Sequence, residues 1–360
     1  MRYQQRFSAS DPVDAMGGAT PFAEGGETSH VGPYRIHMFK VDQANTYSIY
    51  KNRENGGQGY NYVTNFVVTQ GGAMDVLIVA GGGGGAGMGG GGGAGGYLYY
   101  PNLTVGAGTT SVQVGGGGNN EFAHNDNTQS KGGDSIFGSL TATGGGKGIS
   151  YSSTAPSTPT STGGSGGGGP AYGGYNNGNG FQIPAGSGTP GQGHPGGKGH
   201  HAPHGHAGGG GGGAGQAGFD YDNPNHSIRN NYVPNGTGNR TNLYPPASPY
   251  AAFPTTQKGG NGLANDISGY PTHYAGGGGG GGHPGHAINR SAGGLGGGGE
   301  GVSYHNHNNA PLASDTLHQS GQPGQLNTGG GGGGSTHHST PQQVSGKGGP
   351  GIVIVRYRAR

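Results

Sequence analysis

Hydrophobic and polar residues alternate along the segment 34–41, Tyr-Arg-Ile-His-Met-Phe-Lys-Val. In an extended chain, Tyr34, Ile36 and Met38 lie on one face, and Arg35 and His37 lie on the other. An apolar face opposite a polar face is typical of a strand with one side buried. The pattern therefore predicts a half-buried β-strand over 34–41.

A predominantly apolar run, in which Asp75 is the one charged residue, occurs at 74–80, and a second apolar run occurs near the C-terminus. Both runs have the length of strands, and their lack of alternation indicates burial on both faces. We expect the C-terminal strand to pair with 74–80, so that the two parts of the chain share one small β core. Further strands are predicted at 46–50, 60–69 and 134–143, with a hairpin formed by 97–105 and 110–114 around Gly-Ala-Gly-Thr.

Glycine occurs in blocks between segments rich in Tyr, Asn, His, Pro and Thr. A polyglycine II helix has three residues per turn and no internal hydrogen bonds, so its N–H and C=O groups point sideways. In a bundle, each such helix can bond several neighbours, and only glycine lets backbones approach that closely. The sequence therefore predicts a polyglycine II array built from the blocks 81–96, 115–118, 144–148, 163–169, 208–215, 276–282, 293–301, 329–334 and 346–351.

Composition excludes several classes of protein. Glycine contributes 95 of 360 residues and proline 23, whereas charged residues make up 9%. Large apolar side chains are therefore too few to build an ordinary core for 360 residues, and disorder is the alternative to a glycine array. Glycine has no strict three-residue phase, which excludes collagen, and the absence of cysteine excludes disulfide scaffolds and thiolate metal sites. A net charge of +2 argues against nucleic acid as a partner.

These patterns predict an all-β, partly irregular fold, in which a small β-sheet core joins a bundle of polyglycine II helices linked by long polar loops, with essentially no α-helix. Residues 1–32 are expected to be a polar, irregular attachment or assembly segment, and 33–80 a β-strand region. Residues 81–351 form the glycine-rich array and 352–360 the closing strand. We expect no cleaved signal peptide, no transmembrane segment and no insertion into a membrane.

The loops between glycine blocks are the candidate binding surface, because loops on a rigid scaffold commonly carry recognition. Tyrosine suits such a surface, since it is amphipathic and loses little entropy on contact. The alternative is that each ring packs on its own loop and on the array. The candidates for contact with a receptor are Tyr172, Tyr175, Tyr221, Tyr232, Tyr244, Tyr250, Phe253, Tyr270, Tyr274 and Tyr304.

If successive glycine blocks run antiparallel, alternate loops share an end of the array. Loops 149–162, 216–275 and 302–328 are then expected together at the distal tip, with 170–207, 283–292 and 335–345 at the other end. A hidden crossing at 259–262 would break this pattern.

Seventeen histidines occur, several of them clustered. Two His-x-His pairs have the spacing that places two imidazoles on one side of a strand, and their members are His204, His206, His305 and His307. No carboxylate or further ligand at a fixed spacing accompanies these pairs. Polar loop histidines are therefore the favoured interpretation over a metal site, and no cofactor is expected.

The order of segments along the chain carries a resemblance. Asp75-Val-Leu-Ile-Val-Ala precedes a long glycine run, and Ser135-Ile-Phe-Gly-Ser-Leu-Thr-Ala-Thr precedes another. Gly346-Lys-Gly-Gly-Pro-Gly-Ile-Val-Ile-Val-Arg-Tyr lies near the end. Over residues 33–358 this order is similar to the glycine-rich domain of tailed-phage tail-fibre proteins, especially from aquatic and cyanobacterial phages. More loosely, the chain resembles the tip adhesins of T-even-like phages, in which polyglycine II helices form a sandwich and variable loops contact the host receptor.

The resemblance implies a non-catalytic virion fibre or tail-fibre tip protein on the virion surface or outside the cell. Its expected partners are a host surface polysaccharide or outer-membrane protein, other virion fibre proteins, and further copies of itself in a trimer or filament. The alternative is a self-assembling structural subunit of an extracellular or viral filament, joined by β-augmentation, whose loops only coat the surface. A polysaccharide-cleaving spike is a third hypothesis, disfavoured because glycoside cleavage needs two carboxylates at a fixed separation and the 15 Asp and Glu are scattered.

Overall fold

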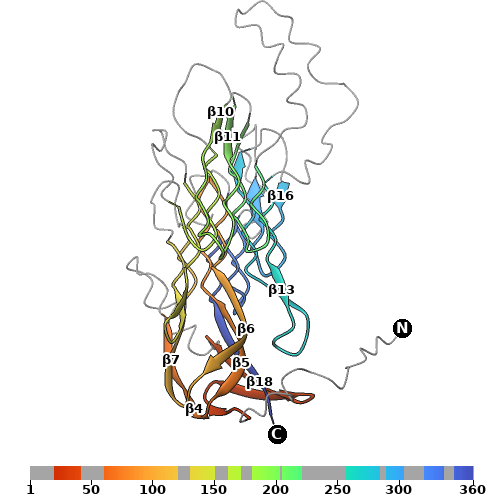
Figure 1. The fold of residues 1–360 in the computed structure, drawn as a ribbon. Helices are drawn as coiled ribbons and strands as arrows, with labels where there is room; N and C mark the ends of the chain where they lie inside the picture. Colours follow the sequence, from red (N-terminus) through yellow and green to blue (C-terminus); the bar gives the residue numbers. More distant parts are fainter. Residues whose placement is uncertain are drawn as a thin grey trace, which may run out of the picture.

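The computed structural model describes residues 20–41, 61–120, 130–150, 161–171, 181–202, 205–220, 257–283, 289–303, 320–335 and 344–359. At 181–182, 201–202, 205–206, 283, 289 and 303 it describes the backbone alone. These ranges contain strands and extended runs, and no helix occurs among them (Figure 1). The predicted all-β fold is confirmed there. Within the same ranges, no helix has the length and apolar character to cross a membrane.

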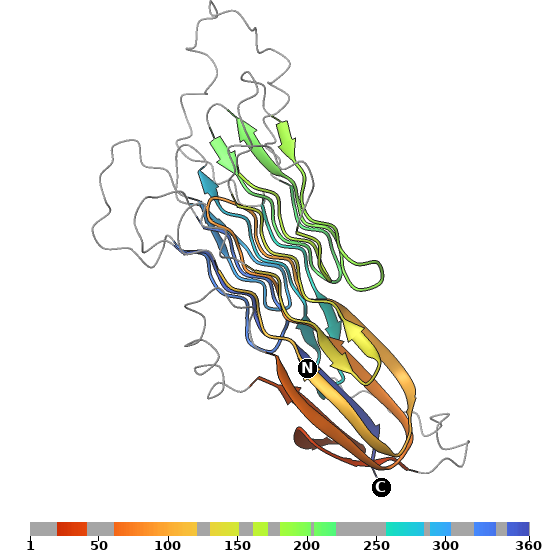
Figure 2. The same ribbon diagram turned by 90° about the vertical axis from the view of Figure 1, so that its left-hand side faces the viewer.

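Two five-stranded antiparallel sheets face each other at one end of the molecule (Figure 2). The first sheet has the order β2-β3-β18-β5-β6. Its strands are β2 Glu27–Val31, β3 Tyr34–Lys40, β18 Ile352–Arg358, β5 Gly72–Val79 and β6 Tyr97–Val105. The second sheet has the order β1-β4-β7-β8-β9. Its strands are β1 Phe22–Glu24, β4 Tyr62–Gln70, β7 Gly108–Val114, β8 Ser135–Phe137 and β9 Leu140–Ala142.

The core between the two sheets is conventional. Phe39, Phe66, Ile78 and Val353 are buried in one cluster there, and the rings of Phe39 and Phe66 meet edge to face with centroids 5.9 Å apart. Strand β18 lies in the middle of its sheet, because it pairs with β5 on one side and with β3 on the other. The predicted pairing of the C-terminal strand with 74–80 is confirmed.

A third layer covers the outer face of the first sheet. It is the hairpin of β13 (Leu263–Asn265) and β14 (Thr272–Tyr274). Ile267 and Tyr274 from this layer belong to one buried cluster with Ile36, Leu77 and Ile354 of the sheet. The guanidinium of Arg356 ties the layers together, since it binds Asp75 of β5 at 2.9 Å and Asp266 of the hairpin at 3.3 Å.

We call the two facing sheets the sandwich. Next to the sandwich, the glycine runs form a lattice that is held by backbone hydrogen bonds. Along the run 81–86, successive amides donate to three neighbouring runs in rotation, so that every third amide returns to the same neighbour. Gly81 and Gly84 donate to 130–133, Gly82 and Gly85 donate to 346–349, and Gly83 and Ala86 donate to 90–93. This period of three is the polyglycine II geometry. It satisfies buried backbone groups that have no strand partner.

The run 89–97 lies at the centre of the lattice. Its amides from Gly90 to Gly96 donate at 2.8–3.1 Å to three runs, and its carbonyls accept from three others. The acceptors lie in 143–149, 209–212 and 329–332, and the donors lie in 80–86, 165–168 and 278–281. Six neighbours leave no room for side chains, and a β-carbon on Gly91 would overlap the carbonyl of Gly278.

The sandwich and the lattice are continuous in the chain. Strand β5 runs directly into 81–86, and the run 89–97 continues as β6. Strand β7 leads into 115–120 and β9 into 143–149, while the run 344–351 leads into β18. The lattice is therefore anchored on strands that have an apolar core of their own.

Two expectations about the sandwich are wrong. Segments 97–105 and 110–114 do not form a hairpin, because β6 pairs with β5 and β7 pairs with β4. The turn at Gly106 thus crosses from one sheet to the other. Strand β3 is not half-buried, because the second sheet covers one face and the hairpin β13–β14 covers the other, leaving His37 fully buried.

The segment 1–32 is also less irregular than predicted, since β1 and β2 lie within it. Strand β2 lies at the edge of its sheet, and its Glu27, Thr28 and His30 are exposed. Because four of its five residues are polar, its sequence lacks the alternation of apolar and polar residues that predicts a strand. Residues 1–19, and the strand predicted at 46–50, lie outside the described residues.

Candidate functional site

At the end of the lattice opposite the sandwich, many of the described lattice runs begin or end (Figure 1). The tight turn at 87–89 marks this end, where Ala171 donates to the carbonyl of Met88 and Met88 donates to Ser335. We call it the distal end. Run ends located there flank the segments 172–180, 203–204, 221–256, 284–288, 304–319 and 336–343.

The opposite side of the lattice carries short turns instead. Gln192 donates to Thr189, Gly213 donates to Gln216, and Gly298 donates to Gly294, each closing a reversal of the chain. Positive φ angles at Gly191 (76°), Gly296 (99°) and Gly297 (89°) fit these reversals. Another reversal is made by the hairpin β13–β14.

The predicted alternation of loops between the two ends is therefore wrong. Glycine blocks such as 208–215 and 293–301 contain a reversal or lead directly into one, so a single block does not correspond to one pass through the lattice. The flanks of 172–180 lie at the same end as those of 221–256, although the two loops were expected at opposite ends. The hidden crossing considered at 259–262 exists, and it leads into β13.

A six-stranded sheet forms the base of the distal end, with the order β10-β11-β12-β15-β17-β16. Its strands are only two to four residues long. They are β10 Phe181–Ile183, β11 Gly199–Ala202, β12 Gly205–Ala207, β15 Gly282–His283, β16 Asn289–Ser291 and β17 Gly301–Ser303. Each continues a lattice run, so this small sheet is held by the lattice below it.

Of the ten predicted receptor-contact residues, the structure describes two, and both belong to the hairpin β13–β14 near the sandwich. Tyr270 is 73% exposed at the tip of the hairpin. Tyr274 is 3% exposed and packs in the buried cluster on the outer face of the first sheet. Its assignment to a receptor surface is therefore wrong. The other candidates, Tyr172, Tyr175, Tyr221, Tyr232, Tyr244, Tyr250, Phe253 and Tyr304, lie outside the described residues.

The predicted metal pairs are not brought together by the part of the chain that the structure describes. His204, His305 and His307 lie outside it, and His206 is described by its backbone in β12. Among the side chains that the structure describes, no three of His, Asp or Glu are grouped closely enough to hold a metal ion.

Sequence reasoning missed a buried polar network around His37. Its Nδ1 donates to the carbonyl of Gly25 at 2.7 Å, and its Nε2 accepts from the hydroxyl of Tyr357 at 3.1 Å. The amide of Ala23 donates to that same hydroxyl at 3.0 Å. Burial lowers the pKa of His37, and the nearby charges of Arg35 and His30 lower it further. The network joins β1, β3 and β18 and is structural.

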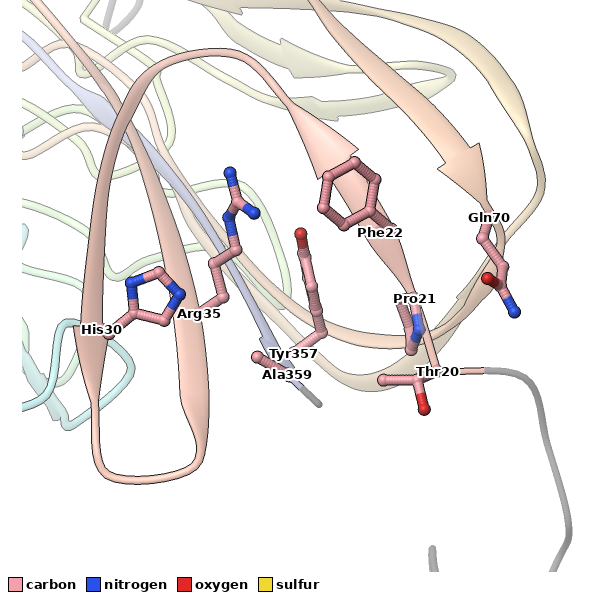
Figure 3. Close-up of a pocket in the computed structure, with 8 residues that line it drawn as sticks. All are labelled: Thr20, Pro21, Phe22, His30, Arg35, Gln70, Tyr357 and Ala359. Atoms are coloured by element: carbon pink, nitrogen blue, oxygen red, sulfur yellow. The ribbon is translucent and has the colours of Figure 1, made fainter.

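A pocket of about 320 Å³ lies beside this network at the sandwich end (Figure 3). Thr20, Phe22, Arg35, Gln70 and Tyr357 line it, and the guanidinium of Arg35 lies over the ring of Phe22 at 5.2 Å. No carboxylate is among its lining residues, so this pocket lacks the acid pair that glycoside cleavage requires.

Several carboxylates in the described ranges bind backbone or arginine groups. Asp134 accepts from the amide of Gly144 at 2.7 Å, and Asp220 accepts from that of Lys198 at 2.6 Å. Asp75 and Asp266 share Arg356. These contacts organise run ends and the hairpin.

Comparison with known proteins identifies a family for this chain. The sequence profile of the glycine-rich domain family matches residues 61–358. A search among curated proteins found no match. The matched segment includes β4 to β18 and the whole described lattice. The chain therefore belongs to the family of proteins that contain this glycine-rich domain.

Proposed function

We propose that the protein is a non-catalytic virion fibre or tail-fibre tip adhesin, which presents its variable segments on a glycine lattice to bind a host-cell surface. The observation that carries this proposal is that the lattice runs flanking the segments 172–180, 221–256 and 304–319 end together at the distal end. Chain segments that start from one end of a rigid scaffold suit recognition, since the scaffold fixes their ends at no entropic cost during binding.

The segment 221–256 contains five of the predicted contact aromatics: Tyr221, Tyr232, Tyr244, Tyr250 and Phe253. Its flanks are fixed in the lattice, since Asp220 accepts from the amide of Lys198 and the carbonyl of Gln257 accepts from the amide of Gly280. A host surface polysaccharide or outer-membrane protein is the proposed partner. Tyrosine suits a binding surface of this kind, because it supplies a large contact area with few rotatable bonds.

The test is binding of the labelled full-length protein to a panel of aquatic bacteria, including cyanobacteria. Replacing 221–256 by a short Gly-Ser linker is expected to abolish binding or change the strains that are bound. The matched control is Leu295→Ala, which removes an exposed apolar side chain from the turn side of the lattice and is expected to leave binding unchanged. If replacement of both 221–256 and 304–319 leaves binding intact in a protein with a normal melting transition, the proposal is wrong.

A filament subunit remains the second candidate, and one observation favours it. In the described part of the chain, β2 and β6 border the first sheet and β1 and β9 border the second, so each sheet has edges. An edge strand can pair with a strand of another copy. Negative-stain microscopy and light scattering separate the two functions, because an adhesin gives discrete particles and a subunit of this kind gives filaments that lengthen with concentration.

A further inference from the structure

The pocket at the sandwich end receives side chains from both sheets (Figure 3). In the first sheet, Arg35 of β3 is directly opposite His30 of β2 on one side and Tyr357 of β18 on the other. Positions directly opposite each other on antiparallel strands share one face, so these three residues form one row along the pocket. In the second sheet, Phe22 of β1 is opposite Gln70 of β4, and both line the pocket. The pocket is therefore built on strands that the core of the sandwich holds in place.

Arg35 supplies a positive charge that no described carboxylate neutralises. Its guanidinium lies over the ring of Phe22 at 5.2 Å, and this cation–π contact holds it in position. The Nε of Arg35 is buried and has no hydrogen-bond partner among the described residues. None of the ion pairs in the described part of the chain includes Arg35. A buried donor without a partner has a desolvation cost, which an anion beside the guanidinium would offset through its charge.

The size and lining of the pocket suit a short acidic side chain. Its volume of about 320 Å³ is at the lower end of the range for ligand pockets, so it takes a small group. Thr20 and Gln70 also line it, and their hydroxyl and amide groups are donors that a carboxylate oxygen can accept from. The rings of Phe22 and Tyr357 offer apolar contact for a short alkyl stem. A carboxylate on such a stem is the side chain of aspartate or glutamate.

The place of the pocket in the molecule favours another protein chain as the source of this group. Strands β1 and β2, which contribute Phe22 and His30, are both edge strands of the described sheets. Phe22 is 46% exposed although it is a large apolar residue. Arginine and aromatic residues beside a pocket are typical of the centre of protein–protein interfaces. The pocket also lies at the opposite end of the molecule from the distal end, at which we propose contact with the host.

We propose that this pocket binds an acidic side chain of a neighbouring protein chain, with the carboxylate on the guanidinium of Arg35. The site is separate from the proposed host binding, so a loss of host binding in the variant of 221–256 leaves it unaffected. His37 provides a reporter for it. Burial lowers the pKa of His37, and the positive charge of Arg35 lowers it further. A carboxylate bound to Arg35 offsets that charge and is therefore expected to raise the pKa of His37.

The test titrates the full-length protein with the blocked peptide acetyl-Gly-Ser-Glu-Ser-Gly-amide and follows the imidazole resonances of the histidines by NMR. The comparison peptide has glutamine in place of glutamate. We expect saturable binding of the glutamate peptide at least tenfold tighter than that of the glutamine peptide, since a carboxylate forms the stronger bond to a guanidinium. The pKa of His37 is expected to rise only with the glutamate peptide. Arg35→Gln is expected to remove both differences.

The matched control is Arg358→Gln, which removes the same charge from a residue that is exposed and does not line the pocket. It is expected to change the affinity less than twofold. Thermal melting of each variant without peptide detects a loss of fold. If Arg35→Gln does not fold, Phe22→Ala replaces it as the test. That variant keeps the charge, loses the ring beneath the guanidinium, and is expected to bind about threefold more weakly.

Equal binding of the two peptides overturns the proposal, as does absence of saturable binding. It is also overturned if a folded Arg35→Gln variant keeps the preference for glutamate, or if Phe22→Ala, where it is the test, binds as the wild type does. Glucuronate serves as the probe for an acidic sugar. Binding of glucuronate that is tighter than binding of the glutamate peptide would assign the pocket to a saccharide and overturn the proposed protein partner.

Discussion

Gly91 lies in the central run, where its amide donates to Gly209 and its carbonyl accepts from Gly168. We expect Gly91→Ala to destabilise the protein by about 3 kcal/mol, because its β-carbon would overlap the carbonyl of Gly278 and the backbones would have to separate. Chemical denaturation followed by circular dichroism measures the change.

Gly106→Ala is the control for that substitution. A β-carbon at Gly106 meets no atom within 4 Å, so we expect a change between zero and a stabilisation of about 1 kcal/mol, which comes from the unfolded state. Equal effects at the two positions would contradict the lattice, because both substitutions add the same methyl group.

His37 makes stability depend on pH. Its pKa is lowered by burial from the ordinary value of 6.5, so below pH 6.5 the unfolded chain binds a proton that the folded protein does not bind. The free energy of unfolding is therefore expected to fall as the pH drops from 6.5 toward the lowered pKa, by at most about 1.4 kcal/mol per pH unit from this group.

His37→Gln tests this assignment. The variant is expected to lose about 1–3 kcal/mol at pH 7, because Gly25 and Tyr357 lose well-placed partners. Its stability is also expected to depend less on pH between 5 and 6.5 than that of the wild type, as measured by urea denaturation at several pH values. A pH dependence equal to that of the wild type would show that other histidines cause it.

At the scale of elements, the hairpin β13–β14 belongs to the core although its sequence has the character of a loop. Tyr274→Ala is expected to cost about 3 kcal/mol, because the ring fills the cluster on the outer face of the first sheet. Tyr270→Ala, four residues away and 73% exposed, is expected to change stability by less than about 0.5 kcal/mol. Thermal melting of the two variants compares them, and similar values would contradict the placement of the hairpin.

Both tyrosines occur in the same kind of polar segment, and both were predicted to contact a receptor. Residue type alone did not separate them, because tyrosine suits a buried and an exposed position equally. Ile267 in the same segment could have indicated that part of this segment is buried. It is one of few aliphatic residues in a long polar stretch, and it is fully buried.

At the scale of the whole molecule, the lattice is expected to unfold in one step. Each run bonds several others, so no run can leave without breaking the hydrogen bonds of its neighbours. Hydrogen exchange with mass spectrometry should show the amides of 90–96 exchanging only through global unfolding. Exchange of these amides at the rate of an unstructured peptide would contradict the lattice.

The sequence by itself determined those features that depend on local chemistry. Alternation located β3, apolar runs located β5 and β18, and glycine blocks predicted polyglycine II, because the lack of a β-carbon is sufficient for close backbone packing. Short polar edge strands such as β2 left no such pattern.

Only the tertiary structure decided which runs are neighbours and where the chain reverses. Hydrogen bonds between glycine backbones are the same for every pair of runs, so no side chain identifies the partner of a given block. The common distal end, the buried hairpin, the environment of His37 and the pocket beside Arg35 all follow from that arrangement, and each joins residues that are distant in the sequence.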